Sequence, residues 1–305
     1  MLKINKYSFI KNAAVLGVAS LSLSLIATSS SFSDGHIYGE NNPVTVKGYK
    51  GSKTDSTAYT GQMARQLQHN SLKKIVSKGN PKDPTSNTLN KMLNYFENKD
   101  KTKSMAILDP KSSSKFPVKQ KMVGEISTGS NLAGKADGRP QLSWPNNMTG
   151  ADVIRFMIKK ASKVSGGVDM RNGMNYPQLI SKYTMGAVLY HQACDNYLDE
   201  KMTANNKPND KPYKKGAYYT GKEHSWDEAF GYWGAAAHTM TLSAQQSYDV
   251  AKKKDLKAAD FNKDGVVDLY KEMTYGHAYY ASAFDRSGKT NYLKTVTKAF
   301  IDGRK

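Results

Sequence analysis

The sequence predicts an all-α, multi-helix bundle, and two observations carry this prediction. Apolar residues recur three and four residues apart over most of the chain after Tyr59, and residues suited to helix caps precede several of these runs. No segment shows the polar and apolar alternation of a half-buried strand. Helix packed on helix is the architecture that satisfies both observations.

The N-terminal residues 1–33 predict a secretory signal peptide. Three lysines precede an apolar run at 13–27, and small polar residues follow it. The run is short and interrupted by serines, so a cleaved signal is expected rather than an uncleaved anchor. We therefore expect residues 34–305 to form a single all-helical domain in the periplasm or outside the cell, with no membrane span after cleavage.

Within this domain the helices are expected in a simple order. Residues 34–58 are rich in Gly, Asn, Lys and Thr and predict an extended lead-in. Asp83 with Pro84, and later Thr149, are suited to begin helices. The stretch 100–147 loses its period and predicts a long irregular central loop. The expected helices are 59–78, 84–97, 150–162, 177–202, 226–238, 242–254, 266–284 and 291–301.

Charge and motifs narrow the function classes. The formal net charge of +19 falls to +16 when the three signal lysines leave, but the lysines are dispersed and outnumber arginine, which favours a solvated surface over a nucleic-acid reader. Cys194 is the only cysteine, so no internal disulfide is expected. Neither H-E-x-x-H nor G-x-S-x-G occurs, which leaves a metal-dependent hydrolase as the least favoured class.

The stretch "DFNKDGVVDLYKE", residues 260–272, has the spacing of a calcium loop. Acidic and amide side chains alternate, glycine stands sixth and Asp268 ninth, whereas the twelfth position holds Lys271 and the next carboxylate comes one place late. A polar, helix-capping turn is the alternative. A single static calcium ion is expected, with Glu272 on the first turn of the next helix. The expected ligands are Asp260, Asn262, Asp264, the Val266 carbonyl group, Asp268 and Glu272.

Histidine and carboxylate pairs suggest a second metal site. His191 and Asp195 stand four apart, as do His224 and Glu228, and facing helices with such pairs build metal centres in bundles. The structural interpretation of the second pair is capping by Ser225 with Glu228, and a competing capping box of Thr220 with Glu223 would begin the helix earlier. Candidate ligands for iron or another transition metal are His224, Asp227, Glu228, His191, Asp195 and His277.

Three stretches, "TAYTGQMARQLQHNSLKKI", "EHSWDEAFGYWG" and "DFNKDGVVDLYKEM", resemble an uncharacterised family of exported bacterial proteins, a domain of unknown function found alongside imelysins. The resemblance covers residues 57–300. It implies an imelysin-like helical bundle, and by analogy with imelysins a role in iron uptake. Their G-x-H-x-x-E motif is not matched in spacing, because Gly221 precedes His224 by one residue too many and Asp227 replaces the glutamate.

Two functions of different classes follow from these observations. The first is an exported soluble binding protein for iron or another metal, with envelope metal-uptake components as partners and a structural calcium loop. The alternative is a structural or interaction protein of the cell envelope that binds acidic polymers through its lysine-rich surface.

Overall fold

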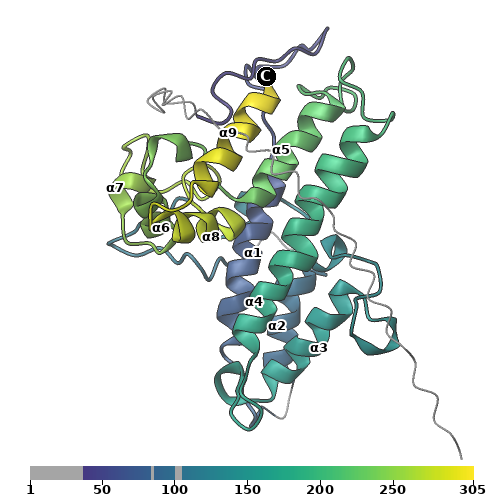
Figure 1. Cartoon of the computed structure of the whole chain (residues 1–305), viewed down its shortest axis with the longest axis vertical. Helices are drawn as coiled ribbons and strands as arrows, with labels where there is room; N and C mark the ends of the chain where they lie inside the picture. The colour runs from purple at the N-terminus through teal and green to yellow at the C-terminus, as the bar shows by residue number, and fades with distance from the viewer. Residues whose placement is uncertain (1–36, 84–85, 100–104) are drawn as a thin grey trace, which may run out of the picture. The chain divides into compact units, whose positions relative to one another are not determined.

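The computed structural model describes residues 37–83, 86–99 and 105–305, which belong to one unit, Ser33–Lys305, of the two into which the chain divides. Within the described residues nine α-helices dominate, and the only sheet is a two-stranded one (Figure 1). The fold is therefore mostly α-helical, as the hydrophobic period predicts.

Some predictions fall on parts of the chain that lie outside the described residues. They are the signal peptide at 1–33, the first residues of the lead-in, Pro84 at the start of the second helix, and residues 100–104 of the central loop. In the part of the chain that is described, no helix has both the length and the apolar character needed to cross a membrane.

The predicted helices occur in the expected order with shifted ends, whereas the two short strands and α7 were not predicted. The α-helices are α1 Thr60–Val76, α2 Asn87–Glu97, α3 Gly150–Ser162, α4 Tyr176–Thr184, α5 Gly221–Trp233, α6 Ala244–Ala251, α7 Leu256–Ala259, α8 Gly276–Asp285 and α9 Tyr292–Arg304. A π-helix, η5, spans Met185–Lys201, and the short 3₁₀ helices are η1 Val123–Glu125, η2 Ala133–Lys135, η3 Pro145–Asn147, η4 Ser165–Gly167 and η6 Thr239–Thr241. The strands β1 Val168–Asp169 and β2 Met174–Asn175 pair antiparallel.

Helix α1 lies at the centre of the packing and contacts α2, α4 and α5. Its apolar face carries Met63, Leu67 and Leu72, all fully buried. Burying each such side chain contributes roughly 1.5–3 kcal/mol. Helix α5 runs along η5, while α8 packs against both α6 and α9, and Figure 1 shows α6, α7 and α8 grouped together.

The predicted helix 177–202 is one continuous helical segment, but its second half, η5, is π-helical. A π-helix turns less per residue than an α-helix, so the face that it buries differs from the α-helical stripe. Tyr197 is buried as the α-helical period predicts, but Gln192 is buried too, and Tyr190, which that period would bury, is 54% exposed. The Tyr197 hydroxyl group donates to Glu228 Oε1 on α5 at 3.1 Å.

The prediction of a helix over 266–284 is wrong for its first ten residues, since α8 begins at Gly276. The Val267 N–H donates to the Pro117 carbonyl oxygen at 2.9 Å, and the Tyr275 N–H donates to the Gly234 carbonyl oxygen at 2.7 Å. These acceptors are distant in sequence. They take up the N–H groups that a helix would have paired with the carbonyl oxygen four residues earlier. Tertiary hydrogen bonds have therefore overridden the helical period.

The predicted helix 226–238 also has the wrong ends. Helix α5 begins five residues earlier and ends at Trp233, because Gly234 adopts φ of +84° and closes the helix in the left-handed conformation. A side chain at position 234 would meet the Tyr275 backbone, so only glycine fits this crossing. His238 therefore lies outside α5.

The described part of the central loop, 105–147, contains only 3₁₀ turns and isolated bridges, yet it packs into the core. Its buried apolar residues are Met105, Ile107, Phe116, Val118, Val123, Ile126 and Leu132. The Leu108 N–H donates to the Ser71 hydroxyl group on α1 at 3.0 Å. This segment is therefore part of the domain's core, despite its lack of regular structure.

Candidate functional site

The loop between α7 and α8 folds its first three predicted calcium ligands onto its own backbone. The Asp264 N–H donates to Asp260 Oδ1 at 3.1 Å and to Asn262 Oδ1 at 3.0 Å. Asp260 Oδ2 accepts from the Gly265 N–H at 2.8 Å, and Asp264 Oδ1 accepts from the Val266 N–H at 3.0 Å. Gly265 adopts φ of +87°, as this tight turn requires. Polar Asx-rich turns and the first half of calcium loops share such an arrangement.

Glu272 closes the same loop from the far end. Its Oε1 accepts from the N–H groups of Phe261 and Asn262 at 3.0 and 3.2 Å, and its Oε2 accepts from the Asp268 N–H at 2.8 Å. The residue is 6% exposed, and burial raises the pKa of its carboxyl group. Glu272 lies in a turn before α8 and not on a first helical turn as predicted. It acts as a brace across the loop.

Asp268 connects the loop to the central segment. Its Oδ1 accepts from Gln120 Nε2 and from the Tyr270 N–H, both at 2.9 Å, and its Oδ2 lies 3.7 Å from Lys119 Nζ. Gln120 Oε1 accepts in return from the Leu269 N–H at 2.8 Å. The loop is thereby held at a defined position on the core.

The donor set of the loop suits calcium, which takes oxygen ligands from carboxylate, amide and carbonyl groups. The oxygens are those of the six predicted residues, and four of these residues carry a carboxylate. In the described ranges, no three histidine, cysteine or acidic side chains are grouped so as to hold a metal ion. A cation here would therefore depend also on the Asn262 amide oxygen and the Val266 carbonyl oxygen.

Helix α5 begins at the earlier of the two predicted caps. The Thr220 hydroxyl group accepts from the Glu223 N–H at 3.2 Å, and the Glu223 carboxylate accepts from the Thr220 N–H at 2.7 Å. The interpretation of Ser225 as the cap is wrong, because its hydroxyl group donates to the Gly221 carbonyl oxygen inside the helix. His224 and Glu228 consequently lie one turn apart on α5, with His224 Nε2 3.6 Å from Glu228 Oε2.

Asp227, although adjacent to Glu228, belongs to a different cluster. It is fully buried and accepts from Arg304 Nε at 2.8 Å, from the Tyr38 hydroxyl group at 2.7 Å and from the Ala58 N–H at 2.9 Å. Burial raises the pKa of this carboxyl group to about 6, and the Arg304 charge opposes the rise. With these partners, Asp227 serves as a structural anchor.

The His224 and Glu228 pair lies among aromatic rings. The Tyr219 ring stacks on His224 with centroids 4.5 Å apart, and the Tyr213 ring lies 4.7 Å away. Glu228 Oε1 accepts from Gln62 Nε2 at 2.6 Å and from the Tyr197 hydroxyl group at 3.1 Å. Burial lowers the pKa of His224, while the Glu228 charge acts in the opposite direction. A neutral imidazole beside a carboxylate can offer a metal ion two ligands.

His191 and Asp195 form a separate ionic cluster on η5. His191 Nδ1 lies 3.0 Å from Asp195 Oδ2, and the same carboxylate accepts from Arg139 Nη2 at 2.8 Å. Arg139 also binds Asp137, which holds the pKa of that carboxyl group at about 2. The arginine is thus the charge partner of both acids.

His277 has different surroundings again. Its Nε2 lies 3.2 Å from the Met185 carbonyl oxygen, its ring lies 6.4 Å from that of Tyr190, and burial lowers its pKa. The six predicted transition-metal ligands therefore fall into separate groups, of which two are the histidine and carboxylate pairs.

Sequence reasoning missed Arg304 and Gln120, which bind predicted site residues. Their partners, Asp227 and Asp268, lie 77 and 148 positions away along the chain, so no local pattern indicates these contacts.

Comparison with known proteins adds a family but no function. A family model described as a domain of unknown function, DUF4856, matches residues 47–278. No curated protein and no solved structure matches the chain.

Proposed function

The chain belongs to the DUF4856 family, and we propose that it is an exported binding protein in which the loop 260–272 holds a calcium ion. Support for export is the signal-like pattern of residues 1–33. Support for calcium is the loop itself, in which oxygens of Asp260, Asn262 and Asp264 accept from the backbone N–H groups of one turn, Asp264–Val266. That arrangement is the observation that carries the proposal.

The proposed ligands have two roles in the loop. Asp260, Asn262, Asp264, the Val266 carbonyl group and Asp268 supply the oxygens. Glu272 holds the loop closed through three backbone N–H groups and adds negative charge beside the ion. Calcium would supply a positive charge that offsets the repulsion among these carboxylates and links α7 to the segment before α8. Its role is architectural.

Thermal unfolding of the purified chain in calcium and in chelator tests this proposal. We expect calcium to raise Tm, since an ion that binds only the folded state stabilises it by about 2.7 kcal/mol at a hundredfold excess over Kd. Asp264→Asn should abolish the calcium response, whereas Glu200→Gln, an exposed acid on η5, should preserve it. A wild-type Tm that is indifferent to both calcium and chelator would rule the site out.

The second candidate function is the binding of a transition metal, most of all iron. The observation that favours it is the proximity of His224 and Glu228 on α5. This pair supplies two ligands, whereas stable transition-metal sites use three or four protein ligands. Asp227 cannot complete the set, because Arg304 and Tyr38 occupy its Oδ1 and the Ala58 N–H occupies its Oδ2. The proposal of metal acquisition, with envelope uptake components as partners, therefore depends on whether this pair retains iron.

Metal content after incubation with iron, measured by plasma mass spectrometry, tests the second candidate. The double variant His224→Ala, Glu228→Ala should lose the iron that the wild type retains, and His191→Ala is the matched control from the other pair. Equal iron in the wild type and in the double variant would contradict a site at His224. An envelope-interaction protein that binds acidic polymers would instead show salt-sensitive retention on an anionic polysaccharide and no bound iron.

A further inference from the structure

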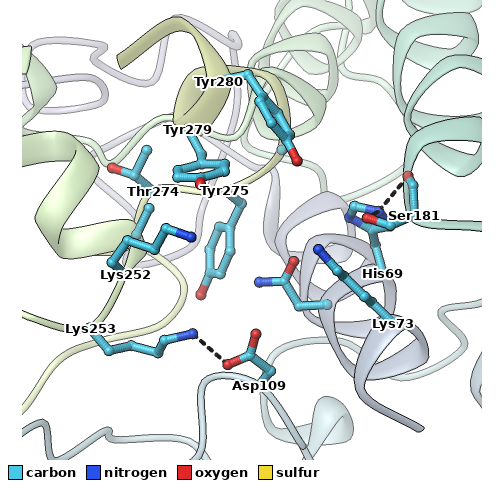
Figure 2. Close-up of a pocket in the computed structure, with 13 residues that line it drawn as sticks. His69, Lys73, Asp109, Ser181, Lys252, Lys253, Thr274, Tyr275, Tyr279 and Tyr280 are labelled. Atoms are coloured by element: carbon cyan, nitrogen blue, oxygen red, sulfur yellow. Dashed lines mark hydrogen bonds and ion pairs between the residues drawn. The ribbon is translucent and has the colours of Figure 1, made fainter. Parts of the chain in front are cut away.

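A lysine-lined cavity lies between α1, the segment before Pro110, α4, and the chain from α6 to α8 (Figure 2). Its volume is about 130 Å³, close to the roughly 150 Å³ of a cavity that accommodates a benzene ring. The residues that matter for its chemistry are His69, Lys73, Asp109, Ser181, Lys252 and Lys253. None of them belongs to the calcium loop or to the His224 pair.

The cavity has an excess of positive charge. Lys252 and Lys253 reach in from one side and Lys73 from the other, as Figure 2 shows. Among the described lining residues the single carboxylate is Asp109, and it pairs with Lys253 at 2.6 Å. Three lysines against one aspartate leave a formal charge of +2.

Lys252, which lies on the same side of the cavity as Lys253, is placed over an aromatic ring. Lys252 Nζ is 5.2 Å from the centroid of the Tyr279 ring, and Lys182 Nζ, just outside the lining, is 3.3 Å from that of Tyr280. A ring face attracts a cation without neutralising its charge. Burial lowers the pKa of Lys73, and the charges of Lys182 and Lys252 lower it further, while Tyr280 and Asp109 act in the opposite direction.

His69 adds an acceptor that has no partner in the described residues. The residue is 4% exposed, and burial lowers its pKa to about 4, so the ring is neutral. Its Nε2 lies 2.9 Å from the Ser181 carbonyl oxygen, and because a carbonyl group can only accept, Nε2 carries the proton. Nδ1 is left as a buried acceptor without a hydrogen bond. An occupant that satisfies it must bring an O–H or N–H group.

A second cavity of about 360 Å³ shares Asn70, Lys73 and Asp109 with the first. Its wall includes the amide side chains of Asn175 and Gln178. Amide groups both donate and accept, which suits hydroxyl groups on the organic part of a larger ligand. The two cavities together can hold an anionic group and a polar extension.

We propose that the cavity binds a phosphate dianion that carries, or is attached to, one hydroxyl donor. Its charge of −2 complements the lysines, and its hydroxyl group donates to His69 Nδ1. Hydrogen phosphate meets both requirements by itself, and a phosphate monoester of a hydroxylated molecule meets them while extending into the second cavity. Sulfate has the charge but no donor, and a neutral sugar has donors but no charge.

Calorimetric titration of the full chain in a phosphate-free buffer tests the proposal with four probes, inorganic phosphate, glucose 6-phosphate, sulfate and glucose. We expect inorganic phosphate to bind at least about tenfold more tightly than sulfate, as for one buried hydrogen bond, and glucose not to bind. Tighter binding of glucose 6-phosphate than of phosphate would identify a monoester as the ligand, and the reverse order would identify free phosphate. Equal affinity for sulfate and phosphate, or no binding of either phosphate, would overturn the proposal.

Variants separate the cavity from general surface charge. Lys73→Met should weaken phosphate binding about tenfold, the cost of one charge-assisted hydrogen bond. Lys252→Gln, at the exposed rim, should weaken it too and keeps the test valid if Lys73→Met does not fold. Lys91→Met removes one exposed lysine from α2 and should leave binding unchanged. Equal losses in Lys91→Met and Lys73→Met would contradict a specific site.

Discussion

Arg304 on α9 donates to Asp227 on α5 through a 2.8 Å hydrogen bond, and both side chains are buried. The same guanidinium group donates to the Ser56 hydroxyl group at 2.8 Å and to Glu223 Oε1 at 3.1 Å. Tyr38 completes the set by donating to Asp227 at 2.7 Å. One buried ion pair therefore joins two helices to the segment that precedes α1.

Replacing Arg304 by methionine should destabilise the fold strongly. Asp227 would remain buried without its cation, which costs roughly 3–5 kcal/mol. Urea unfolding of the variant should show the loss as a lower midpoint. Lys305→Met is the control, because its ammonium group is mostly exposed and lies 3.7 Å from Asp302, a surface pair worth about 0–1 kcal/mol. Equal midpoints for the two variants would contradict the role of the pair.

Glu272→Gln and Asp264→Asn should affect the loop 260–272 differently. Glu272 braces three backbone N–H groups, so Glu272→Gln should lower Tm even in chelator. Asp264 is exposed, so Asp264→Asn should change Tm only when calcium is present. Thermal melts in calcium and in chelator separate these responses. If the Tm of Glu272→Gln in chelator equalled that of the wild type, Glu272 would not stabilise the loop as a brace.

Thr220→Ala should destabilise α5 by about 1 kcal/mol, because the N–H of Glu223 would lose its acceptor. Ser225→Ala should cost less, since the Ser225 hydroxyl group only shares a carbonyl oxygen already inside the helix. Chemical denaturation of both variants checks the order. If Ser225→Ala lost more stability than Thr220→Ala, Ser225 would be the helix cap instead.

Acid should destabilise the protein partly through His69. Its pKa falls from 6.5 to about 4 on folding because of burial, so the unfolded chain binds the proton first. The stabilisation is complete above pH 6.5 and is lost as pH falls toward 4, by about 2 kcal/mol at pH 5. His69→Gln, whose amide can still donate to Ser181, should show a smaller loss of stability between pH 7.5 and 5 in urea titrations. An unchanged pH dependence would show that His69 does not carry this effect.

Local patterns predicted the parts of the fold that depend on neighbours in sequence. Helix α3 begins after Thr149 and ends at Ser162 as expected, because the cap and the apolar stripe are both short-range features. The competing cap at Thr220 was also visible in the sequence, but only the hydrogen bonds of the folded backbone distinguish it from a cap at Ser225. The Asx turns of residues 260–266 are local too.

The mostly helical class, the places of most helices and the oxygen-rich turn could be predicted from the sequence, since all of these follow from interactions within a few residues. The folded structure was needed to show that Asp227 pairs with Arg304, that Glu272 lies outside a helix, and that Lys73 and Lys252 line one cavity. These outcomes depend on groups brought together from distant segments by burial of the core. No spacing along the chain encodes such contacts, so the sequence could name candidate residues but not their partners.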